Sequence, residues 1–223
     1  NNKTCFIITG FLEKKYVDNI IEIYKDEKNK IISTWIEQDI DLINNLKLNN
    51  FIVVQSEKPS IETSSIVQSK AIINGINKAK ELGFTHAIRT RIDLHCNNIT
   101  LLKQIFINKY LFEAKLSCLT GIENNNKIYY FDFIIGSSLE NLHNFFFIKD
   151  NTIKNTDVRE FPEIRWAKSY LNKSEEENLT REDIKQIFNF FINDCKEKNI
   201  SFIWLKTNEN IITEYSYVVN GWI

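Results

Sequence analysis

The strongest constraint on the fold is the alternation of short apolar runs with longer amphipathic segments over the first 95 residues. Apolar runs of this length are typical of strands buried on both faces of a sheet. Segments with apolar residues every three or four positions among charges are typical of helices that cover such a sheet. The alternation therefore predicts a Rossmann-like α/β fold with a mixed, mainly parallel sheet and helices on both faces. We expect strands at residues 4–9, 30–35, 50–56 and 85–95, and helices at residues 11–27, 36–48 and 61–82.

The second half of the chain is less regular, and no repeat, linker or low-complexity stretch divides it from the first. We therefore expect a single domain over residues 1–223. Gly83 follows the third expected helix, at the position where a glycine commonly ends a helix. The expected helices of this half cover residues 97–110, 139–148, 162–171 and 180–198, the strands cover 113–119, 127–136, 201–205 and 211–219, and a turn covers 121–126.

The composition limits the classes of partner. The formal net charge is −1, which predicts no general attraction to nucleic acid or to a membrane surface. No apolar run approaches the roughly 20 residues of a membrane-spanning helix, so we expect no transmembrane segment. The four cysteines lie far apart and lack the spacing of a zinc site, which favours reduced, buried thiols and a cytoplasmic location.

Polar residues gather where the expected strands end. In parallel sheets, ligands bind beyond the carboxyl ends of the strands, so these ends predict a ligand site. The chain has no phosphate-binding P-loop, no Gly-x-Gly-x-x-Gly and no nucleophile elbow, which argues against common NTPases and against NAD and S-adenosylmethionine domains. The candidate ligand-binding residues are Thr9, Gly10, Ser33, Thr34, Trp35, Ser56 and Arg91 at the strand ends and Gln68 on the third helix.

The fourth expected strand ends in charge. On alternation, Arg89, Arg91, Asp93 and His95 point to one side, where they are costly to bury unless something neutralises them. One interpretation is a bound phosphate beside a divalent cation. Arg91 would then clamp the phosphate, and Asp93 and His95 would hold Mn²⁺ or Mg²⁺. The other interpretation is an internal Arg–Asp salt bridge, which we expect for Arg89, with His95 as a solvated residue beyond the strand.

Two further carboxylates are candidates for acid–base chemistry. Asp132 interrupts an apolar strand, and an acid among apolar groups can have a raised pKa and act as a general base. Glu163 follows Pro162 at an expected helix start, where the helix dipole favours the charged carboxylate. The alternative for Glu163 is an ordinary acid in the first turn of a helix.

Taken in order, these residues resemble the sugar-nucleotide-dependent glycosyltransferases of the GT-A type, and in particular the WavE-like lipopolysaccharide glycosyltransferase family. The resemblance spans about residues 4 to 171 and rests on short pieces in a fixed order. The pieces are a first strand ending in Gly10, Ile-Ile-Ser-Thr-Trp at 31–35, Gln68, Ile-Arg-Thr-Arg-Ile-Asp at 88–93, Phe-Asp-Phe-Ile-Ile-Gly-Ser at 131–137 and Phe-Pro-Glu at 161–163.

The resemblance implies a glycosyltransferase that binds a nucleotide-diphosphate sugar with residues 1–96 and a glycan or glycoconjugate acceptor with residues 97–223. Asp93 stands where such enzymes carry the metal-binding acid of an Asp-x-Asp motif, and His95 replaces the second acid. Asp132 would lie near a sugar. Glu163 matches the position of the base in inverting members.

Two other readings of the same residues stay open. A nucleotidyl or phosphoryl transferase on a similar sheet would also use the arginines and a metal. A non-catalytic nucleotide-binding domain would use Arg91 and Asp93 as a structural ion pair.

Overall fold

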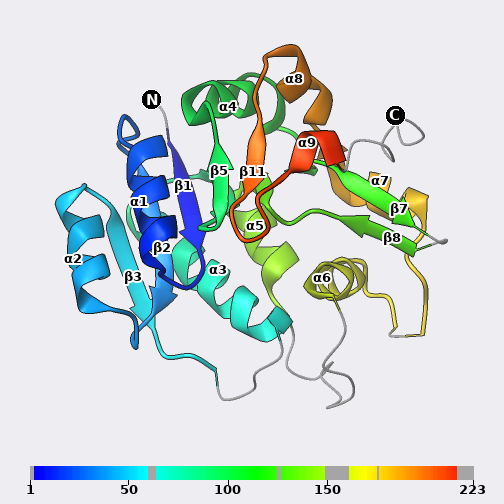
Figure 1. Ribbon diagram of the computed structural model, residues 1–223. Coiled ribbons are helices and arrows are strands. Elements are labelled where there is room, and N and C mark those ends of the chain that lie inside the picture. The colour runs from blue at the N-terminus through cyan, green and yellow to red at the C-terminus, as the bar shows by residue number, and fades with distance from the viewer. Residues whose placement is uncertain (1–2, 60–63, 125–126, 149–160, 175, 215–223) are drawn as a thin grey trace.

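The computed structural model describes residues 3–59, 64–124, 127–148, 161–174 and 176–214. Its centre is a seven-stranded sheet (Figure 1). The strands of this sheet are β1 (Thr4–Thr9), β2 (Lys30–Trp35), β3 (Ile52–Ser56), β4 (His86–Arg91), β6 (Leu116–Cys118), β9 (Ile134–Ser138) and β10 (Phe188–Phe190). Their order is β10-β6-β9-β4-β1-β2-β3, with β9 antiparallel to both of its neighbours and the other pairs parallel. The expected mixed, mainly parallel α/β sheet is confirmed.

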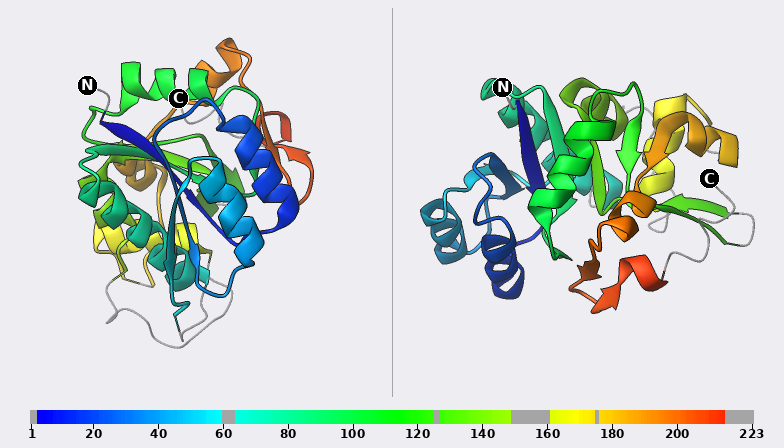
Figure 2. Two further views of the ribbon diagram at one scale, coloured as in Figure 1. Left: turned by 90° about the vertical axis from the view of Figure 1, so that its left-hand side faces the viewer. Right: turned by 90° about the horizontal axis from the view of Figure 1, so that it is seen from above.

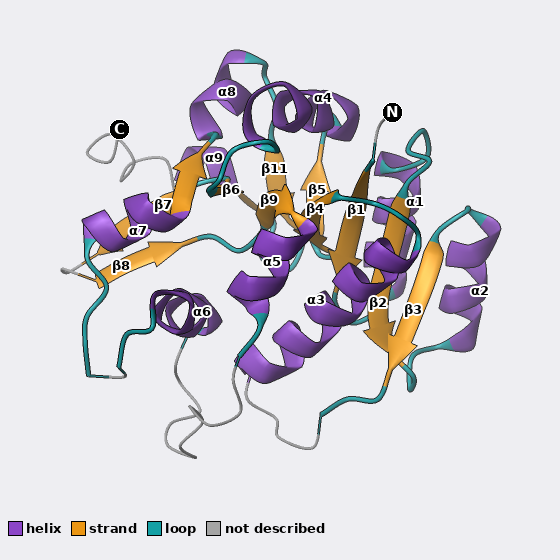
Figure 3. Ribbon diagram, turned by 180° about the vertical axis from the view of Figure 1, so that it is seen from behind, coloured by secondary structure: helices purple, strands orange, loops and turns teal. Residues whose placement is uncertain are grey.

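Helices cover both faces of this sheet. The helices are α1 (Lys14–Ile23), α2 (Ile40–Leu48), α3 (Ser64–Glu81), α4 (Ile99–Ile105), α5 (Leu139–Phe146), α6 (Pro162–Leu171), α7 (Arg181–Ile187), α8 (Ile192–Glu197) and α9 (Ile211–Glu214), and a π-helical turn (Phe106–Tyr110) extends α4. One apolar cluster joins the sheet to α1, α2, α4 and α8, and a second joins it to α3, α5, α6 and α7. In the left view of Figure 2, α1 and α2 lie on one side of the sheet and α3 on the other, and Figure 3 shows α3 and α5 in front of the strands.

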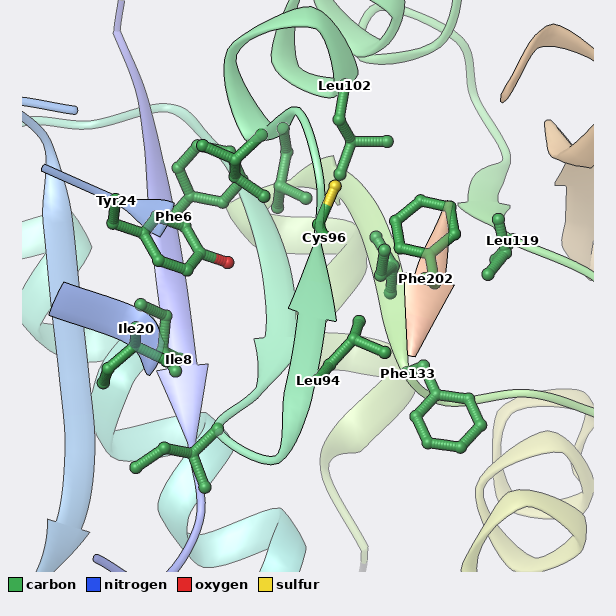
Figure 4. Packing of buried hydrophobic residues seen from close by; sticks show 14 of the residues in the cluster. Phe6, Ile8, Ile20, Tyr24, Leu94, Cys96, Leu102, Leu119, Phe133 and Phe202 are labelled. Carbon is green, nitrogen blue, oxygen red and sulfur yellow. The ribbon is translucent and has the colours of Figure 1, made fainter. Parts of the chain in front are cut away.

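The central strand β1 shows why the apolar runs are unbroken. Its side chains alternate between the two faces: Phe6 and Ile8 belong to the first cluster, and Cys5 and Ile7 to the second. Figure 4 shows Phe6 beside Tyr24, with ring centroids 5.0 Å apart. Because both faces are buried, the four positions between the terminal threonines of β1 are all apolar.

The charged stretch near residue 90 is not one strand, which corrects the expectation for residues 85–95. β4 ends at Arg91, the chain turns at Ile92 and Asp93, and β5 follows in a separate sheet. This small sheet contains β5 (Leu94–Cys96), β11 (Phe202–Trp204) and β12 (Glu209–Asn210), in the order β12-β11-β5. The turn therefore separates His95 from the face that carries Arg89 and Arg91.

Four other expected elements also differ. Residues 127–136 form two strands, β8 (Lys127–Tyr130) and β9, because the chain bends at Asp132. Of the expected turn at 121–126, the first four residues form the strand β7 (Gly121–Asn124), which pairs antiparallel with β8, and the last two lie outside the described residues. The expected helix at 180–198 is interrupted by β10, which pairs with β6 and packs Phe188 against Tyr130. Of the expected strand at 211–219, the first four residues form α9, and the rest lies outside the described residues.

Other sequence expectations hold. Gly83 ends α3 in the left-handed conformation, with φ of 80°. All four cysteines are buried and free. Across the described ranges, no helix has the length and apolar character needed to cross a membrane.

We predict that Gly75→Ala destabilises the protein although alanine favours helices. A Cβ atom at Gly75 would lie 2.5 Å from Cγ2 of Ile7, so α3 would have to move away from β1. Overpacking of this kind costs about 1–3 kcal/mol of unfolding free energy, measurable by urea denaturation. Asn77→Ala, at an exposed position of the same helix, is the control and should stabilise by about 0.5 kcal/mol. Equal stability of Gly75→Ala and wild type would contradict the close packing.

Candidate functional site

A cavity of about 480 Å³ lies at the carboxyl ends of β1, β2 and β4. The first turns of α1 and α3 and the turn between β11 and β12 form its other walls. It lies where a ligand is expected in a parallel sheet. Six of the sequence-predicted site residues line it: Thr9, Gly10, Trp35, Gln68, Arg91 and Asp93.

Gly10 permits the close packing at the end of β1. Its φ is 147°, and a Cβ atom there would lie 2.5 Å from Cγ2 of Ile92. Its carbonyl oxygen accepts a hydrogen bond of 2.9 Å from the hydroxyl of Thr34. The glycine predicted at this strand end is therefore needed for backbone conformation and for space.

Three predicted hydroxyl groups lie in the framework of the site instead of on the cavity wall. Thr34 bonds to Gly10, and Ser33 Oγ donates to the carbonyl oxygen of Ala71 in α3 at 2.6 Å. Ser56 Oγ accepts from the amide of Asn74 at 2.7 Å. These bonds hold α3 and the end of β1 to the sheet.

Arg89 forms the expected buried ion pair. Its Nη1 lies 2.8 Å from Oδ2 of Asp132 and also donates to the carbonyl oxygen of Asp132. The exposed fractions of the two side chains are 2% and 3%. Arg89 Nε and Nη2 donate to Oγ1 of Thr9 at 3.3 and 3.2 Å. The pair ties β4 to the bend before β9 and to the end of β1.

Arg91 continues the charged network toward the cavity. Its Nε and Nη2 donate to the two carboxylate oxygens of Asp93 at 2.9 and 2.8 Å, and its Nη1 lies 3.4 Å from Oδ1 of Asp132. The guanidinium carbon lies 5.1 Å from the ring centroid of Phe133 and 5.6 Å from that of Trp204. Trp204 Nε1 in turn donates to Asp93 at 2.8 Å. Arg91 is thus fixed by two carboxylates and two aromatic rings.

The network fixes the charges of its acids. Burial by itself would raise the pKa of Asp132, but the charges and hydrogen bonds of Arg89 and Arg91 outweigh it and lower that pKa. Burial likewise opposes the ionisation of Asp93, and the bonds from Arg91 and Trp204 lower its pKa below the ordinary value. The arginines therefore favour the anionic form of both aspartates, and neither has the raised pKa of an isolated buried acid.

Glu163 has the opposite behaviour. Burial, followed by the negative charge of Asp132, raises its pKa to about 8. Its Oε2 is buried and has no hydrogen-bond partner among the described residues, and its backbone carbonyl oxygen accepts from the hydroxyl of Tyr130 at 2.6 Å. Glu163 and Asp132 lie beside the arginines and are not among the residues that line the cavity. At neutral pH the Glu163 carboxyl therefore holds a proton, so it is not an ordinary first-turn acid.

The residues that were expected to hold a metal ion do not fit one. Both carboxylate oxygens of Asp93 accept hydrogen bonds from Arg91, and Trp204 adds a third. His95 does not line the cavity, and its Nδ1 lies 2.7 Å from Oδ1 of Asn19. In the part of the chain that the structure describes, no three His, Cys, Asp or Glu side chains are grouped to bind a metal ion.

Sequence reasoning missed the contribution of the C-terminal segment. Trp204 and Lys206 come from the end of β11 and the turn after it, and Lys206 lines the cavity. Lys58 and Tyr16 also line it. Nothing in the local sequence marks Trp204 as a site residue, because its partner Asp93 lies 111 positions away.

No protein-family model matches the sequence, and no curated protein matches it. Three similar solved structures were compared. A Bacillus anthracis protein assigned as a glucose-1-phosphate thymidylyltransferase has 12% identity and a TM-score of 0.49, with 84% of this chain and 85% of that chain covered. A cytidylyltransferase from Leptospira borgpetersenii has 13% identity and a TM-score of 0.43, with 74% and 68% covered. A mannose-1-phosphate geranyltransferase from Thermus thermophilus has 8% identity and a TM-score of 0.41, with 78% and 68% covered.

The names of these three proteins are those of transferases. At such identities and TM-scores, the likeness establishes no family and no activity for this chain. The function has to be argued from the site.

We predict that Arg89→Met lowers the unfolding free energy by about 3–5 kcal/mol, because it leaves the buried Asp132 carboxylate short of a partner. Urea denaturation measures the loss. Adding Asp132→Asn to this variant should recover part of it. Lys14→Met breaks an ion pair in which both side chains are largely exposed, and as the control it should cost less than about 1 kcal/mol. An Arg89→Met variant as stable as the control variant would refute the structural role of the pair.

We predict that Glu163 makes stability fall as pH rises from 5 to 8. The folded protein keeps a proton up to a pKa of about 8, whereas the unfolded chain releases it near 4.5. Each pH unit in this window therefore costs up to about 1.4 kcal/mol of unfolding free energy. Glu163→Gln should lose this dependence, and Glu140→Gln, which changes an exposed acid of α5, should keep it. Parallel pH profiles for Glu163→Gln and wild type would contradict the raised pKa.

Proposed function

We propose that this chain is a transferase that binds a nucleotide-diphosphate sugar in the cavity and moves the sugar to a hydroxyl group of a glycan or glycoconjugate. The observation that carries the proposal is the charge of the cavity. Its size is typical of small-molecule sites, which span roughly 300–1,000 Å³. Four lining side chains are cationic, namely Arg89, Arg91, Lys58 and Lys206, whereas Glu13 and Asp93 are anionic. The buried Asp132 offsets Arg89, which leaves an excess of one positive charge at the cavity of a chain whose net charge is −1.

The positive end of α3 adds to this charge. Ser64 and Gln68, in the first turns of this 18-residue helix, line the cavity. The unpaired N–H groups at a helix N-terminus favour a bound anion. A diphosphate between this terminus and Arg91 would meet positive charge on two sides.

Aromatic residues offer a place for the remainder of the donor. Phe11, Tyr16 and Trp35 line the cavity, and the ring centroids of Phe11 and Trp35 are 6.3 Å apart. Phe11 is 50% exposed although it follows a buried strand. Tyr16 and Trp35 are themselves buried, so Phe11 is the ring that offers an exposed face. Exposed aromatic faces bind bases and sugars by stacking, which supports a nucleotide sugar over a simple phosphate.

The proposed reaction is a single displacement. The acceptor hydroxyl oxygen attacks the anomeric carbon, and the bond from that carbon to the phosphate oxygen breaks, so the configuration inverts. The bonding electrons leave with the diphosphate, which Arg91 and the lysines stabilise. Glu163 is our candidate for the base that takes the hydroxyl proton: with a pKa of about 8, a minor fraction of the carboxyl is ionised at neutral pH, and this reactive fraction grows as the pH rises toward 8.

A second candidate is a domain that binds a nucleotide without catalysis. The observation in its favour is that Asp93 and Asp132 are both ion-paired with arginines and that Glu163 lies off the cavity wall. A binding domain would need no base. Nucleotidyl transfer would use the same cavity with a nucleoside triphosphate and a sugar 1-phosphate, so both substrates belong in the assay.

We predict that at least one UDP-, GDP- or dTDP-sugar raises the melting temperature of the protein and is consumed in the presence of a hydroxyl acceptor. Glu163→Gln should keep the thermal shift but lower the transfer rate by about 100-fold or more, since general bases contribute roughly 10²–10⁴. Glu140→Gln serves as the matched control. Full transfer by Glu163→Gln would move the base elsewhere, binding without turnover would support the binding domain, and no thermal shift with any nucleotide would refute the proposed function.

A further inference from the structure

Protein donors occupy three of the about four acceptor positions of the Asp93 carboxylate. Three N–H groups reach its carboxylate, two from Arg91 at 2.9 and 2.8 Å and one from Trp204 at 2.8 Å. Its backbone carbonyl oxygen accepts from the amide of Leu205 at 2.9 Å. Only 10% of the side chain is exposed. A cation at this carboxylate would have to displace a guanidinium that binds it through two parallel hydrogen bonds.

Arg91 is held in one orientation with donors to spare. A guanidinium has five N–H donors, and the carboxylates of Asp93 and Asp132 use three of those of Arg91. The guanidinium group of Arg91 lies over the rings of Phe133 and Trp204. The Arg91 side chain is 25% exposed and lines the cavity. A cation that is already fixed loses little entropy when it binds a phosphate.

Asp93 also holds the segment that leads to a second cation, through its carboxylate to Trp204 Nε1 and through its backbone carbonyl oxygen to the amide of Leu205. Trp204 and Leu205, which bond to Asp93, immediately precede Lys206 at the cavity. β11, which ends at Trp204, pairs with β5 directly after the turn that contains Asp93. Asp93 therefore sets the position of Arg91 from the N-terminal half and of Lys206 from the C-terminal segment.

From these contacts we infer that the site holds the diphosphate of its ligand without a divalent cation, using Arg91 and Lys206, and that Asp93 is the positioning residue for both. The inference rests on the proposed function, because it assigns the way in which the proposed donor is held. It replaces the metal-ligand role of Asp93 and His95 with a purely cationic protein site.

The first test is calorimetric titration of the full chain with UDP, GDP and dTDP, in EDTA and in Mn²⁺. We expect the best-bound nucleotide to have dissociation constants in the two buffers that agree within about threefold. Binding that needs Mn²⁺, with a gain of about tenfold or more, would overturn the cation-free site but leave the proposed function standing. Absence of binding in both buffers would overturn both.

The second test uses variants. Lys206→Gln should weaken nucleotide binding by about tenfold in both buffers, since it removes a charged contact. Lys196→Gln makes the same change on an exposed face of α8 and should have no effect. Asp93→Asn should weaken binding equally in EDTA and Mn²⁺, and His95→Ala should leave it unchanged. If Asp93→Asn or His95→Ala weakens nucleotide binding in Mn²⁺ buffer only, the substituted residue is a metal ligand instead.

A double variant separates positioning from a general effect on the fold. If Asp93 acts by placing Lys206, the combined loss in Asp93→Asn/Lys206→Gln is smaller than the product of the two single losses. If the loss of affinity in the double variant equals the product of the two single losses, Asp93 does not position Lys206. The exposed Lys206 tolerates substitution, so its single variant tests the cationic site even if Asp93→Asn unfolds.

Discussion

The ion pair between Arg89 and Asp132 is the interaction on which the site depends. Arg89 lies in the middle of the sheet with 2% of its side chain exposed, and no neutral neighbour could compensate its charge. Asp132 reaches it only because the chain bends between β8 and β9. That bend leads β9 back antiparallel beside β4. The bend at Asp132 therefore has two effects: it makes β9 antiparallel to its neighbours in the seven-stranded sheet, and it brings the Asp132 carboxylate to Arg89.

The pair also controls groups that do not belong to it. The second oxygen of Asp132 faces Arg91, so one buried acid orients two guanidinium groups. The same negative charge, added to burial, raises the pKa of Glu163. The ion pair thus helps to raise the pKa of Glu163, which lies near two fixed arginines. Shifted pKa values of this kind are typical of groups that act in acid–base catalysis. Structural and chemical roles are not alternatives for these residues.

The sequence predicted the first half well because its strands are buried on both faces. For such strands, local composition decides the structure, and Gly10, Trp35 and Arg91 could be placed at strand ends without knowledge of their partners. In the second half, contacts with residues far away in the sequence determine where strands and helices begin and end. The break in residues 127–136 depends on an arginine 43 positions away, and β10 forms inside an expected helix because it adds an edge strand to β6. Periodicity contains no information on either contact.

Asp93 illustrates the same limit at the level of chemistry. A carboxylate at a strand end beside an arginine can bind a metal or hold the arginine, and the local sequence Arg91-Ile92-Asp93 is identical in both cases. What distinguishes them is whether the remaining oxygen lone pairs face other donors. Here Trp204 supplies that donor, and the turn after Arg91 takes His95 into another sheet. A carboxylate can therefore act as a metal ligand only where protein N–H groups leave its oxygens unoccupied. The local sequence does not show whether such N–H groups are present.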